Sequence, residues 1–512
     1  MNKTRSKSRQ KWLKWSLIGV LCLAALVAAA VLEENWRAAR EWEQFKTARL
    51  ARGEKLDFKD FVPAQVTGAS NFAFEPLVAA SYEGVLDKDG HEIRPHTNRG
   101  VNRLLEIAVD DQGLYGEGGR SHGNWLLGRM TDLASWQAYY RTLPDMFAVP
   151  PQPRKPAQDI LLALGKHDRA IEELREASKW PSRFPLNYGE EDPARFLQPH
   201  LLALKHCTTL LELRAAAELR NEQVDLAFQD VMLTFRLADT IHSEPFIDSQ
   251  VSRIQMIQSA IQPIYEGMAS NTWSDDQLMA FDAALAKLDF LKDYEWVMRA
   301  DRAMRMSQIE YLRRTRDFSG VANNSDFAHF FGASAASFYR MAPRACFYRS
   351  ERELASLYEQ FVLPLVDADR HQVSSAAAGK LEARSAEIRS GPVNDVLARM
   401  FFSVLFQPTP KFVREQACVD LTRTAIALER YRRANHEYPA SLDALVPQFA
   451  DHVPLDVVDG KPLHYRREDN GRFILYSVGW DGRDDGGTMV IRKGTSVTDD
   501  TKGDIVWRYP SP

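Results

Sequence analysis

The chain has 512 residues, which is enough for more than one domain and for a large hydrophobic core. Hydrophobic residues make up 45% of it and charged residues 26%, as is ordinary for a folded body in water. The formal net charge of −4 excludes a general nucleic-acid binder, which would carry a strong basic excess.

The N-terminus predicts a transmembrane anchor. Residues 1–15 carry six Lys or Arg and no acid, and residues 16–32 carry no charge at all. At 1.5 Å per residue, a helix over 16–32 spans about 26 Å, close to the thickness of a hydrocarbon core. Trp12, Trp15 and Trp36 suit the two interfaces of such a membrane.

The charge pattern also predicts the orientation of this anchor. The basic flank stays in the cytoplasm, so the chain after Glu33 lies outside it as a single-pass protein. The alternative is a cleaved signal peptide, because Ala28 to Ala30 offer a cleavage site. The anchor is favoured because the apolar run is long enough to span by itself, and in both cases the body is exported.

Four cysteines are too few for a disulfide framework. Cys22 lies in the apolar run, and Cys207, Cys346 and Cys418 are far apart, without a C-x-x-C pair. This spacing predicts mainly buried free thiols, with one disulfide as the alternative in an oxidising compartment.

The composition changes along the chain and predicts four further regions. Residues 33–55 are rich in helix formers and mixed charge, which predicts a helical stalk. Residues 56–155 are irregular or mixed, 156–410 form a helical domain, and 411–512 form a separate α+β domain. The predicted fold class is therefore mainly α with a C-terminal α+β unit.

Within the helical domain, two segments that meet at Arg220–Asn221 predict an αα-hairpin. The second segment repeats apolar residues every three or four positions, at Val224, Ala227, Phe228, Val231, Phe235 and Ala238. The hairpin weakly resembles a tetratricopeptide unit. Because no 34-residue repeat is sustained, the pattern favours a helical bundle.

The last hundred residues predict a helix on a small antiparallel sheet. An apolar face runs through a helix that ends at Asn435, and the strand-like segments "PLHYRRE" and "RFILYSV" follow. In the second strand, alternation places Phe473, Leu475 and Ser477 opposite to Ile474, Tyr476 and Val478.

This order resembles the globular domain of the type II secretion major pseudopilin. The matching pieces are "ALERYRRANHEYPASLDALV", "PLDVVDGKPLHYRR", "ILYSVGWDGRDDGG" and "GDIVW", about a fifth of the chain. The resemblance implies that Tyr438-Pro439 is the structural turn after the helix. It also implies a calcium site, in which Ser477, Asp481 and Asp504 are the carried-over metal ligands and backbone oxygens complete the shell.

The sequence departs from that family in two respects. Lys502 stands where the family usually has an acid, and the missing oxygen would come from Asp484, Asp485, Asp499 or Asp500. The alternative to calcium is a solvated turn of Asp and Gly. In addition, the N-terminal helix lacks the prepilin Gly-Phe-x-x-x-Glu signature and lies about 380 residues before the pilin-like helix, so no pilus polymerisation is expected.

Other catalytic or metal motifs are weak. "HEIRPH" (91–96) differs from the zinc motif H-E-x-x-H by one residue, and Pro95 breaks the helix that the motif needs. "GEGGRSHG" lacks the Gly-Lys-Ser/Thr of a phosphate-binding loop, and no G-x-S-x-G elbow is present.

These features predict a membrane-anchored exported scaffold or interaction protein, more readily than an enzyme, with protein partners. The chain as a whole resembles exported bacterial proteins held in the cytoplasmic membrane, and this resemblance implies no activity. One alternative is a cell-envelope hydrolase with its site in the helical body or in the glycine-rich residues 110–125. The other is a component associated with secretion machinery that contacts pilin subunits.

Overall fold

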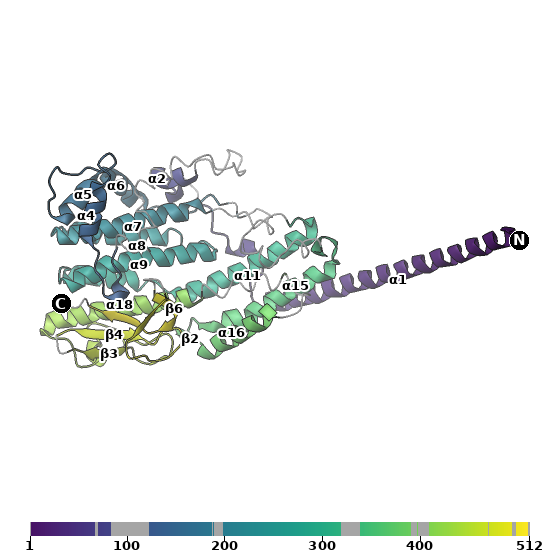
Figure 1. Cartoon of the computed structure of the whole chain (residues 1–512). Coiled ribbons are helices and arrows are strands. Elements are labelled where there is room, and N and C mark those ends of the chain that lie inside the picture. Colours follow the sequence, from purple (N-terminus) through teal and green to yellow (C-terminus); the bar gives the residue numbers. More distant parts are fainter. Residues whose placement is uncertain are drawn as a thin grey trace.

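The structure is a computed structural model of the 512-residue chain. The description covers residues 2–66, 70–82, 122–186, 188, 198–318, 338–390, 397, 409–468, 471–493 and 498–509. The fold is mainly helical, with a few small antiparallel sheets and one long apolar N-terminal helix (Figure 1). At this level the predicted fold class is confirmed.

Helix α1, Asn2–Leu50, leaves the body as a long rod (Figure 1). Its side chains from Trp12 to Ala30 are exposed, whereas Ala38 and Trp42 are buried against the body. The exposed part is the one predicted to cross a membrane. Among the described residues, α1 is the one helix long and apolar enough to do so.

The segment predicted as a stalk is helical to Leu50, and it lies along helix α15, Arg344–Leu357. Trp42, Leu56, Met306 and Ala355 form a small apolar cluster between α1 and the body. Burial of this cluster explains why the part of α1 that follows the apolar run packs against the body.

The helical body consists of antiparallel and crossing helices around one core (Figure 1). Its longer helices are α4 (Leu133–Arg141), α5 (Pro156–Leu164), α6 (Asp168–Ala177), α7 (Pro199–Arg220), α8 (Val224–Asp239), α9 (Ile247–Ala269), α10 (Asp275–Leu285), α11 (Phe290–Thr315), α15 and α16 (Ser375–Ser390). Short helical turns join them, among them η5 (Trp125–Leu127) and a π-turn at Tyr358–Val362 after α15.

Capping side chains fix where several helices begin. At α10, the Ser274 hydroxyl accepts from Gln277 N at 3.2 Å, and the Gln277 side chain accepts from Ser274 N at 2.9 Å. At α4, Asp132 accepts from the backbone N–H groups of Ala134 and Ser135, both at 3.1 Å. Both caps satisfy otherwise unpaired donors of the first turn.

The predicted αα-hairpin is present as α7 and α8. Helix α7 ends at Arg220, and the apolar stripe of α8, which includes Ala227, Val231 and Ala238, is buried. Helix α9 packs on both members of the hairpin, so the three helices form a layer of the body. The likeness to a tetratricopeptide unit stays a prediction.

The C-terminal unit opens with α18, Thr409–Asn435, which ends at the predicted residue. The strands of its main sheet are β3 (His464–Arg467), β4 (Phe473–Ser477) and β7 (Ile505–Arg508), all antiparallel in the order β3-β4-β7. A second small sheet pairs β5 (Met489–Ile491) with β6 (Thr498–Gly503). A helix on a small antiparallel sheet is therefore confirmed as an arrangement.

The two faces of β4 are both covered, so all five of its residues are buried. Phe473 and Leu475 join the main core, while Ile474 and Tyr476 pack with Val506 on the other face, as the alternation predicts. Val478 departs from the predicted alternation and joins the main core, because it follows the end of the strand.

The C-terminal unit shares its core with the helical body. The Tyr265 hydroxyl on α9 donates to the Arg508 carbonyl at 3.0 Å, and the Trp125 and Trp507 rings lie 5.1 Å apart. Tyr294 on α11 packs edge-on against Phe412 on α18. These contacts join residues from distant parts of the sequence into one cluster.

A short hairpin from the body also reaches the C-terminal unit. It consists of β1 (Val366–Asp367) and β2 (Gln372–Val373). Val373 N donates to the Val457 carbonyl at 2.7 Å. The Gln372 side chain lies over Gly460, where a Cβ atom would overlap its amide and where φ is +71°.

All four cysteines are free in the structure. The motif at 91–96 and the glycine-rich stretch up to residue 121 lie outside the described residues, so their predicted roles are not placed.

Candidate functional site

Of the three residues carried over as calcium ligands, Ser477 ends strand β4, and Asp481 and Asp504 lie on two neighbouring loops of the C-terminal unit. Asp481 belongs to the turn after β4, and Asp504 stands between β6 and β7. A Cβ atom at Gly479 would overlap the Gly503 carbonyl oxygen, so only glycine allows the first loop to lie this close to the second.

Asp504 is buried and organises the glycine-rich loop. Its carboxylate accepts from the backbone N–H groups of Asp485 at 3.2 Å, Gly487 at 2.7 Å and Thr488 at 3.1 Å. Burial raises the pKa of Asp504, and the three N–H donors counteract only part of that effect. This carboxylate thus closes the loop by hydrogen bonds.

Asp481 is exposed and lies beside the loop that precedes Asp504. Its carboxylate accepts from Arg483 N and from Gly503 N, both at 3.2 Å. Asp481 therefore accepts from the residue that directly precedes Asp504. The structure brings these two predicted ligands to one place.

The Ser477 side chain contacts a third acid, Asp456. Its hydroxyl donates to Asp456 Oδ1 at 3.0 Å, and Asp456 also accepts from Val458 N at 2.9 Å and Val478 N at 2.8 Å. Asp456 is buried, and burial raises its pKa. Sequence reasoning missed this residue, although it lies inside the matching piece "PLDVVDG".

The other acids near this site are engaged in contacts of their own. Asp500 pairs with Arg414 and with Arg492, the latter at 3.2 Å. Asp484 accepts from the Tyr476 hydroxyl at 3.1 Å, and His464 lies 3.6 Å from it. These contacts tie the loops to α18 and to the sheet.

The donor set can be compared with what calcium requires. Calcium takes six to eight oxygens at 2.3–2.6 Å, whereas the Asp504 oxygens here accept N–H groups. No three His, Cys, Asp or Glu side chains in the described ranges are grouped closely enough to hold a metal ion. Calcium binding would need backbone carbonyls and a rearranged Asp504, and it stays a prediction.

An open cleft lies between the Asp481 loop and the β1–β2 hairpin. It has a volume of about 730 Å³. Its lining is largely polar and includes Asp367, Arg370, Gln372, Ser374, Asp459 and Asp481. A polar, open cleft of this kind suits a peptide segment better than a small apolar ligand.

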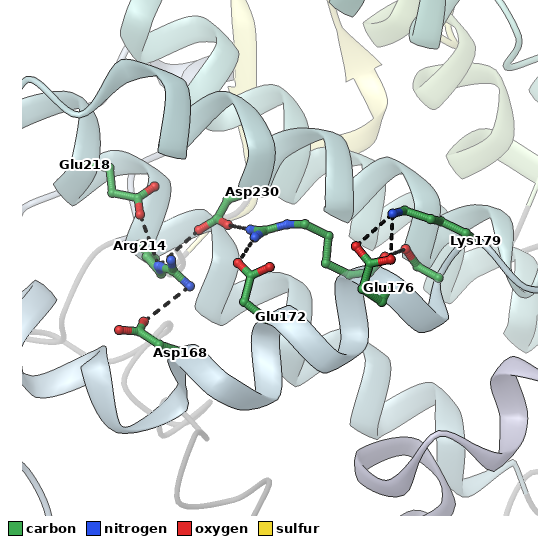
Figure 2. Close-up of polar contacts among 9 residues, drawn as sticks. Asp168, Glu172, Glu176, Lys179, Arg214, Glu218 and Asp230 are labelled. Atoms are coloured by element: carbon green, nitrogen blue, oxygen red, sulfur yellow. Dashed lines mark hydrogen bonds and ion pairs between the residues drawn. The ribbon is translucent and has the colours of Figure 1, made fainter.

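The helical body contains a buried network of ion pairs (Figure 2). Asp230 on α8 is fully buried and accepts from Arg175 Nη2 of α6 at 2.7 Å. Arg214 Nε of α7 lies 3.3 Å from the other Asp230 oxygen and donates to Glu218 at 3.1 Å. Burial raises the pKa of both acids, and the arginines oppose this effect.

Surface acids extend this network to solvent. Asp168 lies 3.6 Å from Arg214 Nη1, and Glu172 pairs with Arg175 (Figure 2). The arrangement joins α6, α7 and α8 through ion pairs. We interpret the network as structural, because paired buried charges fix the position of the helices that carry them.

A second charged group in the body reaches the surface. Half-exposed His242 lies with Nε2 2.9 Å from Asp293 Oδ1, and Arg253 pairs with the second oxygen of Asp293. Burial acts to raise the pKa of Asp293, but the hydrogen bonds from His242 and Arg253 outweigh it and hold the pKa below its usual range. Sequence reasoning missed this group, because its members are far apart in the chain.

Comparison with known proteins adds no relative: no protein-family model, curated protein or solved structure matches the chain.

Proposed function

We propose that the protein is a membrane-anchored platform whose body lies outside the cytoplasm and binds a protein partner. One observation carries this proposal: α1 is a single helix whose apolar half is fully exposed and whose polar half is docked on the body. Exposed apolar surface of that length is unfavourable in water and favourable in a bilayer.

The docking of α1 makes the anchor a rigid part of the body. Arg49 on α1 donates to Glu359 at 3.2 and 2.9 Å. Arg302 is fully buried, lies 2.9 Å from Glu54, and donates to the Lys55 carbonyl at 3.2 Å. These contacts support a body that is rigidly joined to its anchor, as a platform requires.

The cleft beside Asp481 is the proposed partner-binding surface. It is open, polar and lined by two structural units, which are features of sites that bind peptide segments. The pseudopilin resemblance also belongs to this end of the chain, and the loop that carries Asp481 and Gly482 forms one wall of the cleft.

Anchoring and orientation can be tested in bacterial cells that express the full chain. In a C22A/C346A background, cysteine in place of exposed Met279 on α10 should react with a membrane-impermeant maleimide in intact spheroplasts. Cysteine at Ser6 in the basic segment should react only after lysis. The protein should remain in the membrane pellet after a carbonate wash, and L23R/L26R should release it, whereas L23A/L26A should not.

Reaction of Met279→Cys only after lysis would overturn the proposed orientation. Release of the unmodified chain by carbonate would overturn the anchor.

The partner-binding surface can be tested by photo-crosslinking. A photoreactive residue at Arg370, in the cleft, should yield a discrete crosslinked band in cells, and the same residue at Met279 should not. Identification of a pilin subunit in that band would assign the protein to secretion machinery. Equal crosslinking at both positions would contradict the cleft as the binding surface.

A second candidate function is an envelope hydrolase, and one arrangement in the helical body favours it. An accessible histidine oriented by a buried carboxylate, as in His242 and Asp293, is the arrangement of a general base. A panel of ester, amide and phosphoester substrates tests this candidate. Turnover that H242Q abolishes and that H452Q, at an exposed histidine, retains would support a hydrolase.

A further inference from the structure

The turn that leads into α15, residues 338–343, begins with the helical residues 338–341 and presents apolar side chains to solvent. Phe338 is 56% exposed and Met341 is 90% exposed. Arg340 and Arg344 beside them are exposed as well. Exposed apolar side chains flanked by arginines are typical of a surface that lies in a membrane interface.

This exposure is imposed by neighbours that are tied to the body. Buried Tyr339 packs edge-on against Phe347, with ring centroids 5.7 Å apart. Arg316, just after α11, donates from Nη1 to the Tyr339 carbonyl at 2.9 Å and to the Ala342 carbonyl at 3.0 Å. Because these anchoring residues point inward, the side chains between them are held outward.

The turn lies level with the end of the apolar run of α1. Ala345 N donates to Asn35 Oδ1 at 2.7 Å, and Arg349 pairs with Glu34. Asn35 is three residues beyond Leu32, the last residue of the apolar run, which is about 4.5 Å along a helix axis.

The directions of the helices place the turn on the membrane side of these contacts. Glu34, Glu41 and Arg49 of α1 pair in that order with Arg349, Arg352 and Glu359, so α15 and α1 run in the same direction. The N-terminus of α15 therefore points toward the apolar run. The ends of α11 and α15 meet beside the point where α1 leaves the body (Figure 1).

We propose that this turn lies in the headgroup layer of the membrane that α1 crosses, with Phe338 and Met341 among the lipid chains and Arg340 and Arg344 beside anionic phospholipid headgroups. The inference rests on the proposed membrane anchor and adds a second, peripheral contact between body and bilayer. Arginine is suited to this role because its guanidinium group pairs with phosphate in two-point contacts. The positive end of the α15 dipole faces the same headgroups.

A body held by one transmembrane helix can tilt about the exit point of that helix. A lipid contact at the N-terminus of α15 supplies a second point of support beside the anchor. The partner-binding cleft, which is lined by the β1–β2 hairpin and by loops of the C-terminal unit, would then be held in one orientation relative to the bilayer.

Fluorescence quenching in vesicles tests the inference with the full chain. An environment-sensitive dye is attached to cysteine at Met341, at Ile18 in the apolar run, or at exposed Met279 on α10, in a C22A/C346A background. The vesicles contain brominated lipid, with either phosphatidylglycerol or phosphatidylcholine. Quenching and a blue shift are expected at positions 18 and 341 and not at 279. With R340E/R344E, quenching at 341 in phosphatidylglycerol should fall to the level seen in phosphatidylcholine.

The outcomes separate the two proposals. Quenching at 18 without quenching at 341 would overturn the headgroup contact and leave the anchor intact, whereas no quenching at 18 would overturn the anchor itself. Equal quenching at 341 in both lipids would overturn the role of the two arginines. A blue shift at 341 without quenching would show that a protein, such as a second copy of the chain, covers the turn instead of lipid.

Discussion

Asp230 and Arg175 lie 2.7 Å apart in the interior of the helical body, where their contact joins α8 to α6. Arg214 approaches the same carboxylate from α7 at 3.3 Å. Because Asp230 is fully buried, a displacement of any of these helices would leave a charge without a partner in a medium of low dielectric constant.

Asp230→Asn is expected to destabilise the protein strongly. The substitution keeps the shape of the side chain but leaves two arginines without their shared negative charge, which typically costs about 3–5 kcal/mol for a buried pair. The urea midpoint of the detergent-solubilised chain, followed by far-ultraviolet circular dichroism, measures the effect.

A surface pair provides the control for this measurement. Arg169 and Glu173 form an ion pair at 2.9 Å, and the Arg169 side chain is 91% exposed. Arg169→Gln should leave the urea midpoint unchanged. A midpoint for Asp230→Asn equal to that of the control variant would contradict the structural role of the network.

Glu415 should make stability depend on pH. It is buried between α18 and α9, and Gln258 donates to it at 2.6 Å. Burial raises the pKa of Glu415 to about 8, from its usual 4.5. Between these two values the unfolded chain releases the proton and the folded chain retains it, so stability falls as pH rises, by up to about 1.4 kcal/mol per pH unit.

Glu415→Gln should remove this contribution, because the amide does not ionise. The difference in melting temperature between variant and original chain should therefore grow in favour of the variant from pH 5 to pH 8. Glu437→Gln, at an exposed glutamate, is the control and should show no such trend. A constant difference between E415Q and the original chain across this range would disprove the prediction.

Arg302→Met should loosen the docked half of α1. Arg302 holds Glu54 and the Lys55 carbonyl at the end of the α1 segment, and Glu359 lies 3.5 Å from it. Loss of these contacts lowers the free energy of local opening of this segment. A decrease of about 1.4 kcal/mol in that free energy corresponds to a tenfold faster amide exchange. Hydrogen exchange detected by mass spectrometry should accelerate at least about tenfold in residues 42–50.

The control for this variant is Lys46→Gln, because the ion pair of Lys46 with Glu43 and its contact with the Trp42 ring both lie within α1. Amide hydrogen exchange in residues 42–50 should not change in the Lys46→Gln variant. Unchanged exchange in Arg302→Met would mean that apolar packing around Trp42 alone holds α1 in place.

Local signals explain the parts of the fold that the sequence predicts. The end of α18 at Asn435 and the break after Arg220 both depend on residues within one or two helical turns. The two faces of β4 follow from alternation in the same way. Helix and strand signals of this kind act over short stretches, so a single sequence carries them.

Long-range pairings explain what the sequence does not predict. Arg49 and Glu359 are 310 residues apart in the chain, and nothing in residues 33–55 distinguishes a free stalk from a docked helix. Ser477 illustrates the same limit at the candidate site. The resemblance assigns it to calcium, but its hydroxyl donates to Asp456, 21 residues earlier.

Calcium binding at the Asp481 loop can be tested with the full chain. If the site forms, millimolar calcium raises the melting temperature through binding to the folded state, and the effect grows with the logarithm of concentration. Asp481 is the informative position, because it is exposed, asparagine keeps one of its two accepting oxygens, and Asp504 still closes the loop by its own hydrogen bonds. Asp481→Asn should abolish the calcium-dependent shift without lowering the melting temperature in calcium-free buffer.

Magnesium and a distant carboxylate separate a specific site from general screening of charge. Magnesium prefers a tighter octahedral shell and retains its waters, so it should give a smaller shift than calcium at this loop. Asp443→Asn removes an exposed carboxylate elsewhere in the C-terminal unit and should leave the calcium response unchanged. If calcium has no effect on the original chain, the hydrogen bonds that Asp456, Asp481 and Asp504 accept are sufficient to hold these loops, and the acids act as turn-forming residues.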